Sequence, residues 1–222
     1  MSGKAVNLDF HLYVVTGRAQ SKGRDFVDVV KCALQGGAGC IQFREKQLPP
    51  RELLPVARDL LALCREHGAT FIINDHIDVA LAVEADGVHL GQDDFPLPEA
   101  RRIIGDDMIL GASTHSVEQA RRAQAEGADL INIGPIFSTQ TKQTPVRPVG
   151  VELITRVKNA INTPQTCMGG INADNVTQVV SAGAQRIAVV SAVVGAKDIT
   201  AAAANLVHRI RQAKAGSPGS ST

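Results

Sequence analysis

Apolar residues occur along the chain in two alternating patterns. Short runs rich in valine, isoleucine and leucine are followed by longer stretches in which apolar positions recur every three or four residues. Buried parallel strands produce the first pattern and amphipathic helices the second, so their alternation predicts repeated strand-helix units. We expect eight strands, at residues 11–16, 39–44, 70–75, 87–90, 108–113, 130–134, 165–169 and 186–191.

Two of the intervening stretches carry clear helix signals. Between residues 51 and 68 one face is apolar and the other is charged. The apolar face comprises Leu53, Leu54, Ala57, Leu60, Leu61 and Cys64. We expect Ser116 to cap a second helix, with Gln119 three residues later and Gly127 as its left-handed stop.

The strand-helix unit recurs about every 25 residues, which indicates one repeated architecture. Eight units predict a single-domain (β/α)₈ barrel, the TIM barrel of the α/β class. We place the barrel at residues 11–214, between an N-terminal extension at 1–10 and a disordered Gly/Ser/Pro tail at 215–222. A doubly wound open sheet is the alternative, but it more often has GxGxxG after its first strand, and none follows the first strand here.

Composition narrows the classes of function. The 222 residues include 23 Lys and Arg against 22 Asp and Glu, a net charge of +1, and only 3% are aromatic. This composition suggests no nucleic-acid partner. The four cysteines lack zinc-ligand spacing and are expected to be reduced structural thiols. Because we find no targeting segment or apolar membrane span, we expect a cytoplasmic protein that does not bind a membrane.

Polar residues concentrate where the predicted strands end, which is where a barrel builds its active site. At the end of the second strand, alternation turns Gln42, Arg44 and Lys46 to one side. Two cations and an amide there would suit a polyanion. A charge run of this kind fits a solvated face equally well.

Carboxylates follow the third and fourth strands. Asn74 and Asp75 end the run FIIND, and Asp94 closes the segment that follows GVHL. Carboxylates at the ends of adjacent strands can share Mg²⁺, which binds one or two of them together with phosphate oxygens and water. Taken singly, Asp75 and Asp94 are better explained as caps of the next helix.

Three later loops have features of phosphate sites. They offer hydroxyls, an ammonium group, and glycines that permit close backbone approach. Loops seven and eight are also the usual phosphate site of a barrel. The candidates are Thr139, Thr141 and Lys142 after the sixth strand, Gly169 and Gly170 after the seventh, and Val190 and Ser191 after the eighth.

Three other residues are weighed individually. We expect His89, inside a strand, to be a hydrogen-bonded wall residue, whereas His115 at the mouth fits structure and function equally. Cys167 is expected to be a small buried hydrophobe. We find no Ser/His/Asp order, HExxH sequence or glycosidase pair of carboxylates. The residues therefore indicate phosphate or diphosphate chemistry at a barrel mouth, assisted by Mg²⁺.

Seven short segments occur in order at the ends of the predicted strands. They are QFREK at 42–46, IND at 73–75, VHLGQDD at 88–94, GASTH at 111–115, GPIFSTQTK at 134–142, GGI at 169–171 and VVSA at 189–192. Together they resemble the thiamine-phosphate synthase (thiamine-phosphate pyrophosphorylase) family, from residue 12 to about residue 210. The resemblance implies a (β/α)₈ transferase of thiamine biosynthesis. It would join 4-amino-2-methyl-5-(diphosphooxymethyl)pyrimidine to 4-methyl-5-(2-phosphooxyethyl)thiazole, giving thiamine phosphate and diphosphate.

The resemblance also implies roles for individual residues. Asp75 and Asp94 would hold Mg²⁺. The residues implied for the pyrimidine diphosphate are Gln42, Phe43, Arg44, Glu45, Lys46, Asn74, Ser113 and Lys142, of which Arg44, Lys46, Ser113 and Lys142 are the implied catalytic residues. Those implied for the thiazole phosphate are Thr139, Gln140, Thr141, Gly170, Val190 and Ser191.

Some features depart from the family pattern or stay open. Cys167 and Met168 precede the glycine pair where the family often has Gly or Ala before Ile or Leu, and His76 stands where Arg or another polar residue is common. The main alternative is a related thiazole tautomerase with His115 as base, which typically lacks the full diphosphate and metal set. A barrel that senses thiamine phosphates without turnover is a third reading. Monomer and homodimer are both open.

Overall fold

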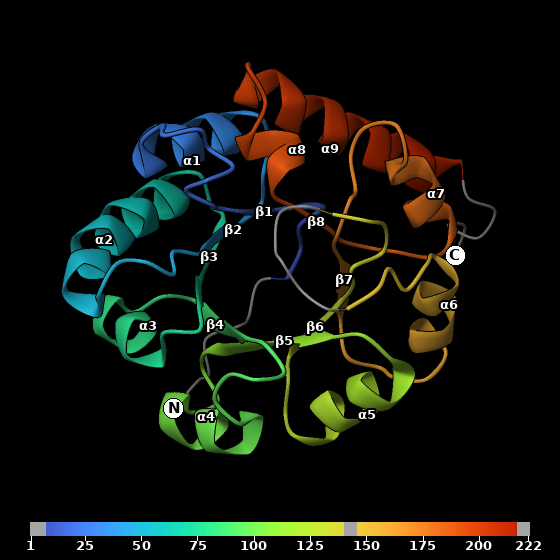
Figure 1. Cartoon of the computed structure of the whole chain (residues 1–222), viewed down its shortest axis with the longest axis horizontal. Helices are drawn as coiled ribbons and strands as arrows, with labels where there is room; N and C mark the ends of the chain where they lie inside the picture. Colours follow the sequence, from blue (N-terminus) through green and yellow to red (C-terminus); the bar gives the residue numbers. More distant parts are fainter. Residues whose placement is uncertain (1–7, 140–145, 217–222) are drawn as a thin grey trace.

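The computed structural model describes residues 8–139 and 146–216 of the chain. Eight parallel strands pair in sequence order, and the last pairs with the first to close a barrel (Figure 1). The strands are β1 Leu12–Val15, β2 Cys40–Phe43, β3 Thr70–Asn74, β4 Gly87–Leu90, β5 Ile109–Thr114, β6 Leu130–Ile133, β7 Gln165–Cys167 and β8 Ile187–Val189. The predicted (β/α)₈ barrel is confirmed, and the open sheet is excluded.

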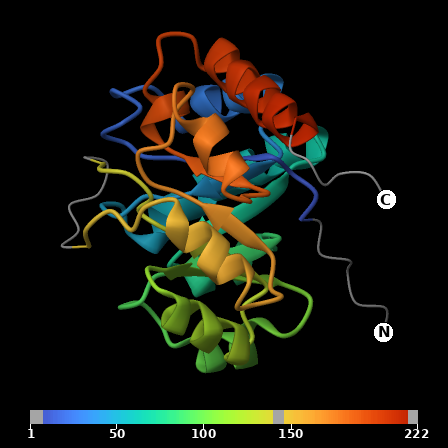
Figure 2. The same ribbon diagram turned by 90° about the vertical axis from the view of Figure 1, so that its right-hand side faces the viewer.

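Helices surround the barrel because each parallel strand returns through a crossover on the outside (Figures 1 and 2). They are α1 Phe26–Gln35, α2 Pro50–Glu66, α3 Ile77–Val83, α4 Leu97–Ile104, α5 Val117–Ala125, α6 Glu152–Lys158, α7 Val176–Ser181, α8 Ser191–Val194 and α9 Ile199–Ala215. The short α8 directly follows β8, and α9 packs against α1 and α7 to complete the ring. Within the described ranges, no helix combines the length and apolar character needed to cross a membrane.

Alternation along the strands divides the buried side chains between two layers. Outward positions such as Leu12 and Val14 pack beneath the helices, in a core that runs around the barrel. Inward positions form a plug inside it, made of Phe10, Tyr13, Val15, Cys40, Ile72, Ile109, Leu130 and Ala188. The barrel is therefore filled, and a ligand must bind at its end.

The local helix signals work as predicted in α2 and α5. The Ser116 hydroxyl accepts a hydrogen bond from the N–H of Gln119, whose side chain in turn accepts from the N–H of His115. Gly127 has φ +88° and forms the predicted stop. Leu54 is only partly buried at the edge of the apolar face. The fully buried face of α2 comprises Leu53, Ala57, Leu60, Leu61 and Cys64.

The last two strands are shorter than predicted. β7 stops at Cys167 because Gly169, two residues later, has φ +101°, far from strand geometry. β8 stops at Val189 because Ser191 already begins α8. The backbone of both segments therefore leaves the sheet at the barrel mouth.

At both ends, the described part of the barrel reaches into a segment that was predicted to lie outside it. Phe10, which falls in the predicted extension, belongs to the inner plug. α9 continues to Ala215. The tail from residue 217 onward lies outside the described residues.

Candidate active site

A cavity of about 890 Å³ opens at the carboxyl ends of the strands. Every strand, or the loop after it, contributes to the lining, as is usual in barrel enzymes. The residues that contribute from β1 to β8 include Val15, Gln42, Asn74, His89, Ser113, Asn132, Met168 and Ala188. The sequence-predicted residues in the lining are Gln42, Arg44, Asn74, Ser113, Thr139, Gly170, Val190 and Ser191. The fold thus brings residues from both halves of the chain to one cavity.

Side chains at the end of β2 alternate between the cavity and the helix layer. Gln42 is buried inside the barrel, where its Nε2 donates to the Tyr13 hydroxyl at 2.7 Å. Arg44 reaches the cavity lining. Phe43 points outward and packs edge to face on Phe26, with ring centroids 5.2 Å apart. Gln42 in β2 and Arg44 just after it are therefore the side chains from this segment that line the cavity.

Glu45 also lies away from the cavity. Its side chain is only 2% exposed and accepts hydrogen bonds from Arg18 Nε and from the N–H of Gln47, both at 2.7 Å. Burial raises the pKa of Glu45, but the Arg18 and Gln47 hydrogen bonds outweigh this and leave the pKa below its usual value. Direct substrate binding by Phe43 or Glu45 would have to use the backbone, since neither side chain lines the cavity.

The acidic residues after β3 and β4 come together on one side of the mouth. Asp75 Oδ2 lies 2.8 Å from Lys46 Nζ. Asp94 Oδ2 accepts a 2.7 Å hydrogen bond from the N–H of Gly91. Burial raises the pKa of Asp94, and the adjacent Asp75 carboxyl raises it further. Two like charges in contact favour the binding of a cation.

Neither carboxylate caps a helix. The N-cap residue is His76 in α3 and Pro96 in α4, and neither helix has a side-chain cap. Asp75 instead has a left-handed backbone, with φ +62°. The capping explanation is therefore wrong for both. In the part of the chain that the structure describes, no three His, Cys, Asp or Glu side chains form a metal cluster. A cation here would need substrate or water ligands.

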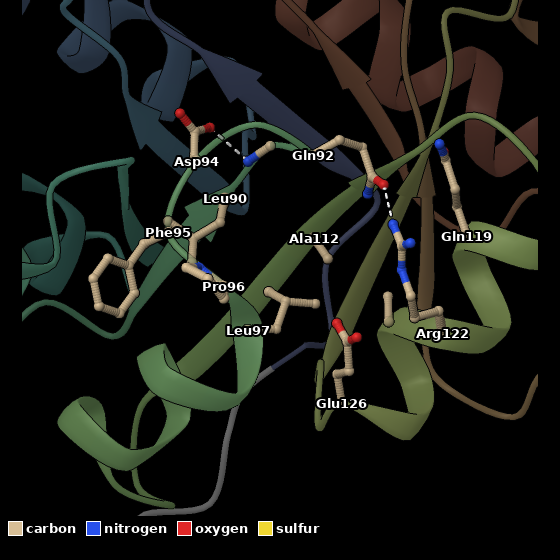
Figure 3. Close-up of a pocket in the computed structure, with 12 residues that line it drawn as sticks. Leu90, Gln92, Asp94, Phe95, Pro96, Leu97, Ala112, Gln119, Arg122 and Glu126 are labelled. Carbon is tan, nitrogen blue, oxygen red and sulfur yellow. Dashed lines mark hydrogen bonds between the residues drawn. The ribbon is translucent and has the colours of Figure 1, made fainter.

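The cavity wall between β4 and β5 is braced by side chains. His89 is buried, and its Nε2 lies 2.9 Å from Ser113 Oγ, which confirms it as a hydrogen-bonded wall residue. Gln92 Nε2 donates to the Ser113 carbonyl at 2.7 Å, and Arg122 on α5 donates to Gln92 Oε1 at 2.6 Å (Figure 3). The position of Ser113 is thus set from two sides.

A smaller pocket of about 270 Å³ lies behind this wall, between α4 and α5 (Figure 3). Leu90, Leu97 and Ala112 contribute apolar surface to it. Gln92 lines both spaces. Gln92 therefore lies between the mouth and the outer pocket, held there by Arg122.

The opposite side of the mouth, after β6, β7 and β8, is built largely from backbone. Gly169 has φ +101° and Gly170 has φ +65°. A Cβ atom on Gly170 would lie 2.5 Å from the Ser138 carbonyl oxygen, and one on Gly169 would lie 2.5 Å from Pro135. Asn175 Nδ2 donates to the Gly170 carbonyl at 2.9 Å. Close packing of these loops therefore requires glycine at both positions.

The backbone side continues into the short helix after β8. Val190 precedes α8 and Ser191 begins it, and both line the cavity. The N–H groups of a first helical turn have no partner within the helix and bind anions readily. Thr139 lines the cavity from the loop after β6. The predicted residues Gln140, Thr141 and Lys142 lie outside the described residues.

Comparison with known proteins places this cavity in a family. The family model described as thiamine monophosphate synthase matches residues 12–193. The chain belongs to the thiamine monophosphate synthase family. The match covers all eight strands and extends into α8, so the whole cavity lies within the family region.

Known members of the thiamine monophosphate synthase family are similar to this chain over most of their length. The thiamine-phosphate synthase of Shouchella clausii is 46% identical over 204 residues, which cover 92% of this chain and 98% of the relative. That of Halalkalibacterium halodurans is 50% identical over 191 residues, 86% of this chain and 90% of the relative. The solved thiamine phosphate pyrophosphorylase from Pyrococcus furiosus has a TM-score of 0.85 and 39% identity, covering 92% and 96% of the two chains. The resemblance seen in the seven segments is confirmed.

The sequence did not predict some of the residues that line the cavity of this family member. Asn132, Gln20 and Asn172 all line the cavity. Asn132 accepts a 2.8 Å hydrogen bond from Thr166 Oγ1 inside the barrel. A polar residue within the apolar run LINIG was the available signal, because an inward polar side chain needs a partner. Gln20 and Asn172 lie in loops, where polar residues are common, so no signal in the sequence pointed to either of them.

His115 is hydrogen-bonded to its surroundings, and Cys167 is buried. His115 lines the cavity, and its Nδ1 is hydrogen-bonded to the Gly134 carbonyl while Gln119 holds its N–H. Cys167 is buried, which raises its pKa to about 12. Cys167 is therefore the small buried hydrophobe that was expected, and the His115 ring is oriented by the barrel wall.

Proposed function

We propose that this chain is a thiamine-phosphate synthase that joins 4-amino-2-methyl-5-(diphosphooxymethyl)pyrimidine to 4-methyl-5-(2-phosphooxyethyl)thiazole and releases diphosphate. One observation carries the proposal. Arg44 and glycine-built loops line one cavity of about 890 Å³, and Lys46, Asp75 and Asp94 lie together beside its mouth, next to the lining residues Asn74 and Asp93. That volume lies in the upper part of the usual range for ligand sites, which suits two small substrates.

Asp75 and Asp94 would hold Mg²⁺ in this enzyme. The chemistry of the two residues fits, because their mutual repulsion contributes to the raised pKa of Asp94 and a cation would relieve it. Diphosphate oxygens and water would complete the coordination. When bound, Mg²⁺ supplies positive charge that offsets the negative charge of the leaving diphosphate.

The chain's own cations would stabilise the same leaving group. The bond between the pyrimidine methylene carbon and the diphosphate oxygen breaks, and its electron pair leaves with diphosphate. The thiazole nitrogen then donates its lone pair to the methylene carbon and forms the new C–N bond. Arg44 and Lys46 would stabilise the diphosphate electrostatically, joined by Lys142 as the resemblance implies. No nucleophilic side chain is needed, which agrees with the absence of a triad from the sequence.

The two sides of the mouth would hold the two substrates in line for this attack. Gln42, Asn74 and Ser113 are available to the pyrimidine. On the other side, the thiazole phosphate would take the Thr139 hydroxyl and backbone N–H groups from Gly170 and from the segment of Val190 and Ser191. When both substrates are held in this way, a reaction between two molecules becomes a reaction within one complex.

A coupling assay tests the proposal. Purified protein supplied with both substrates and Mg²⁺ should release diphosphate and form thiamine phosphate, and EDTA should abolish the reaction until excess Mg²⁺ is added. Absence of product at high enzyme concentration would refute the activity. Full activity in EDTA would refute the Mg²⁺ assignment alone. Thiazole tautomerisation that is lost in His115→Ala, with no coupling in the parent, would favour the related tautomerase instead.

A further inference from the structure

The segment after β2 sends neighbouring residues in opposite directions. Arg44 reaches the cavity and Lys46 approaches Asp75 at the mouth. Glu45, between them, turns away into a site where its side chain is only 2% exposed. A buried carboxylate is stable only when it is paired and hydrogen-bonded. The partners of Glu45 therefore determine where the residues on either side of it can lie.

Those partners come from the loop after β1 and from the segment itself. Arg18 Nε donates to Glu45 Oε2, and the N–H of Gln47 donates to Glu45 Oε1, each at 2.7 Å. The Arg18 guanidinium also lies over the Phe26 ring, 5.2 Å from its centroid. Phe26 packs on Phe43, the last residue of β2. Arg18 is thus packed on α1, which in turn packs on the strand whose end Arg18 holds.

A second connection joins the two loops directly above the sheet. The buried Thr16 accepts a 2.9 Å hydrogen bond at Oγ1 from the N–H of Arg44. Its own N–H donates to the Gln42 carbonyl at 2.9 Å. The backbone from Gln42 to Gln47 is therefore held at Arg44 by Thr16 and at Glu45 by Arg18.

We propose that Arg18 is a positioning residue that, through the buried Glu45 carboxylate, fixes the segment 44–47 so that Arg44 and Lys46 point at the diphosphate. The inference rests on the proposed function. Electrostatic stabilisation requires charges that are already in place before the leaving group departs. A loose segment would leave both cations present but misdirected, and a misplacement of about 1 Å can cost about 100-fold in rate.

The test separates positioning from general stability. Arg18→Ala should raise the KM for the pyrimidine diphosphate about tenfold and lower kcat, while the KM for the thiazole phosphate stays within about twofold of wild type. Arg18→Lys keeps a cation for Glu45 and should recover part of the loss. A merely structural role would reduce the active fraction, and with it the apparent kcat, without separating the two KM values.

A double-mutant cycle tests whether Arg18 acts through Glu45. Glu45→Gln should resemble Arg18→Ala, and the two together should be about as impaired as either alone. Additive losses, or unchanged KM values in both single variants, would overturn the inference. Arg51→Ala is the control. Arg51 also pairs with a glutamate, Glu52, at 3.7 Å, but the two side chains are 84% and 49% exposed. This control should behave as wild type.

Calorimetric titration with inorganic diphosphate in Mg²⁺ provides a readout that needs no turnover. Arg18→Ala should bind diphosphate about tenfold more weakly than wild type. Equal affinities would overturn the positioning role while leaving the proposed function intact. If the wild type makes no thiamine phosphate, the proposed function fails, and the titration still decides whether Arg18 orients the cations.

Discussion

The mouth of this barrel has a charged side, after β2 to β4, and a backbone side, after β6 to β8. The charged side consists of the side chains of Arg44, Lys46, Asp75 and Asp94. The backbone side depends on Gly170 and the start of α8, where the described chain is close-packed and side chains would obstruct. Both sides suit phosphate groups, but through different physical means.

This difference predicts different consequences of substitution. On the charged side, removing a functional group removes charge and leaves the backbone in place. On the backbone side, adding a single methyl group is damaging, because Gly170 has φ +65° and a Cβ atom would lie 2.5 Å from the Ser138 carbonyl. Experiments can therefore compare the removal of a charged group on one side with the addition of a methyl group on the other.

The largest effect is expected from Asp94. Asp94→Ala should lower kcat/KM about 100-fold or more, because a metal ligand contributes several kcal/mol. Asp94→Asn should lose nearly as much while retaining an oxygen that can accept from the Gly91 N–H. Steady-state coupling kinetics at saturating Mg²⁺ provide the measurement. Glu99→Ala, in the exposed first turn of α4, is the control. Wild-type rates in Asp94→Asn would show that the charge is not needed.

The next largest effect is expected from Gly170. Gly170→Ala should cost about 2–4 kcal/mol of stability from the left-handed backbone and overpacking combined, and raise the KM for the thiazole phosphate about tenfold. Gly68→Ala is the matched control, since Gly68 has the same φ of +65° with no neighbour within 4 Å of an added Cβ. It should cost only about 1 kcal/mol and leave both KM values unchanged. Urea unfolding and kinetics measure the two quantities. Equal effects of the two substitutions would remove the packing argument.

A smaller effect is expected on the pH dependence of stability, through the ion pair between Glu45 and Arg18. The pKa of folded Glu45 is lowered, chiefly by Arg18 acting against burial. Its ion pair therefore contributes stability above the unfolded pKa of about 4.3 and loses it as pH falls through the folded value. Urea unfolding of wild type and Glu45→Gln should differ most near neutral pH and converge in acid. A difference that grows in acid would have the wrong sign.

The smallest effect is expected from Ser191. If the thiazole phosphate is held by backbone N–H groups, Ser191→Ala should change its KM by no more than about threefold, because the start of α8 keeps its N–H groups. Kinetics with the thiazole phosphate as varied substrate provide the measurement. A tenfold rise would mean that the hydroxyl itself binds, and would make the two sides of the mouth more alike.

Much of the fold was predictable because its signals are local. The run from Leu53 to Cys64 specifies a buried helix face, and Ser116 with Gln119 specifies a helix start, within a few residues of sequence. The lining of the cavity was predictable where a polar residue ends a predicted strand, as at Arg44 and Asn74. The ends of β7 and β8 were not, because they depend on the left-handed Gly169 and on the extra helix α8.

The sequence by itself determined the order of the eight strand-helix units and the polar residues at their ends, since periodicity and caps act between near neighbours. Only the tertiary structure decided which of those residues share the cavity. It turned Glu45 away to Arg18, 27 residues earlier, and brought Asp75 beside Asp94. These choices depend on contacts between distant segments, which form only when the barrel closes and burial requires each charge to have a partner.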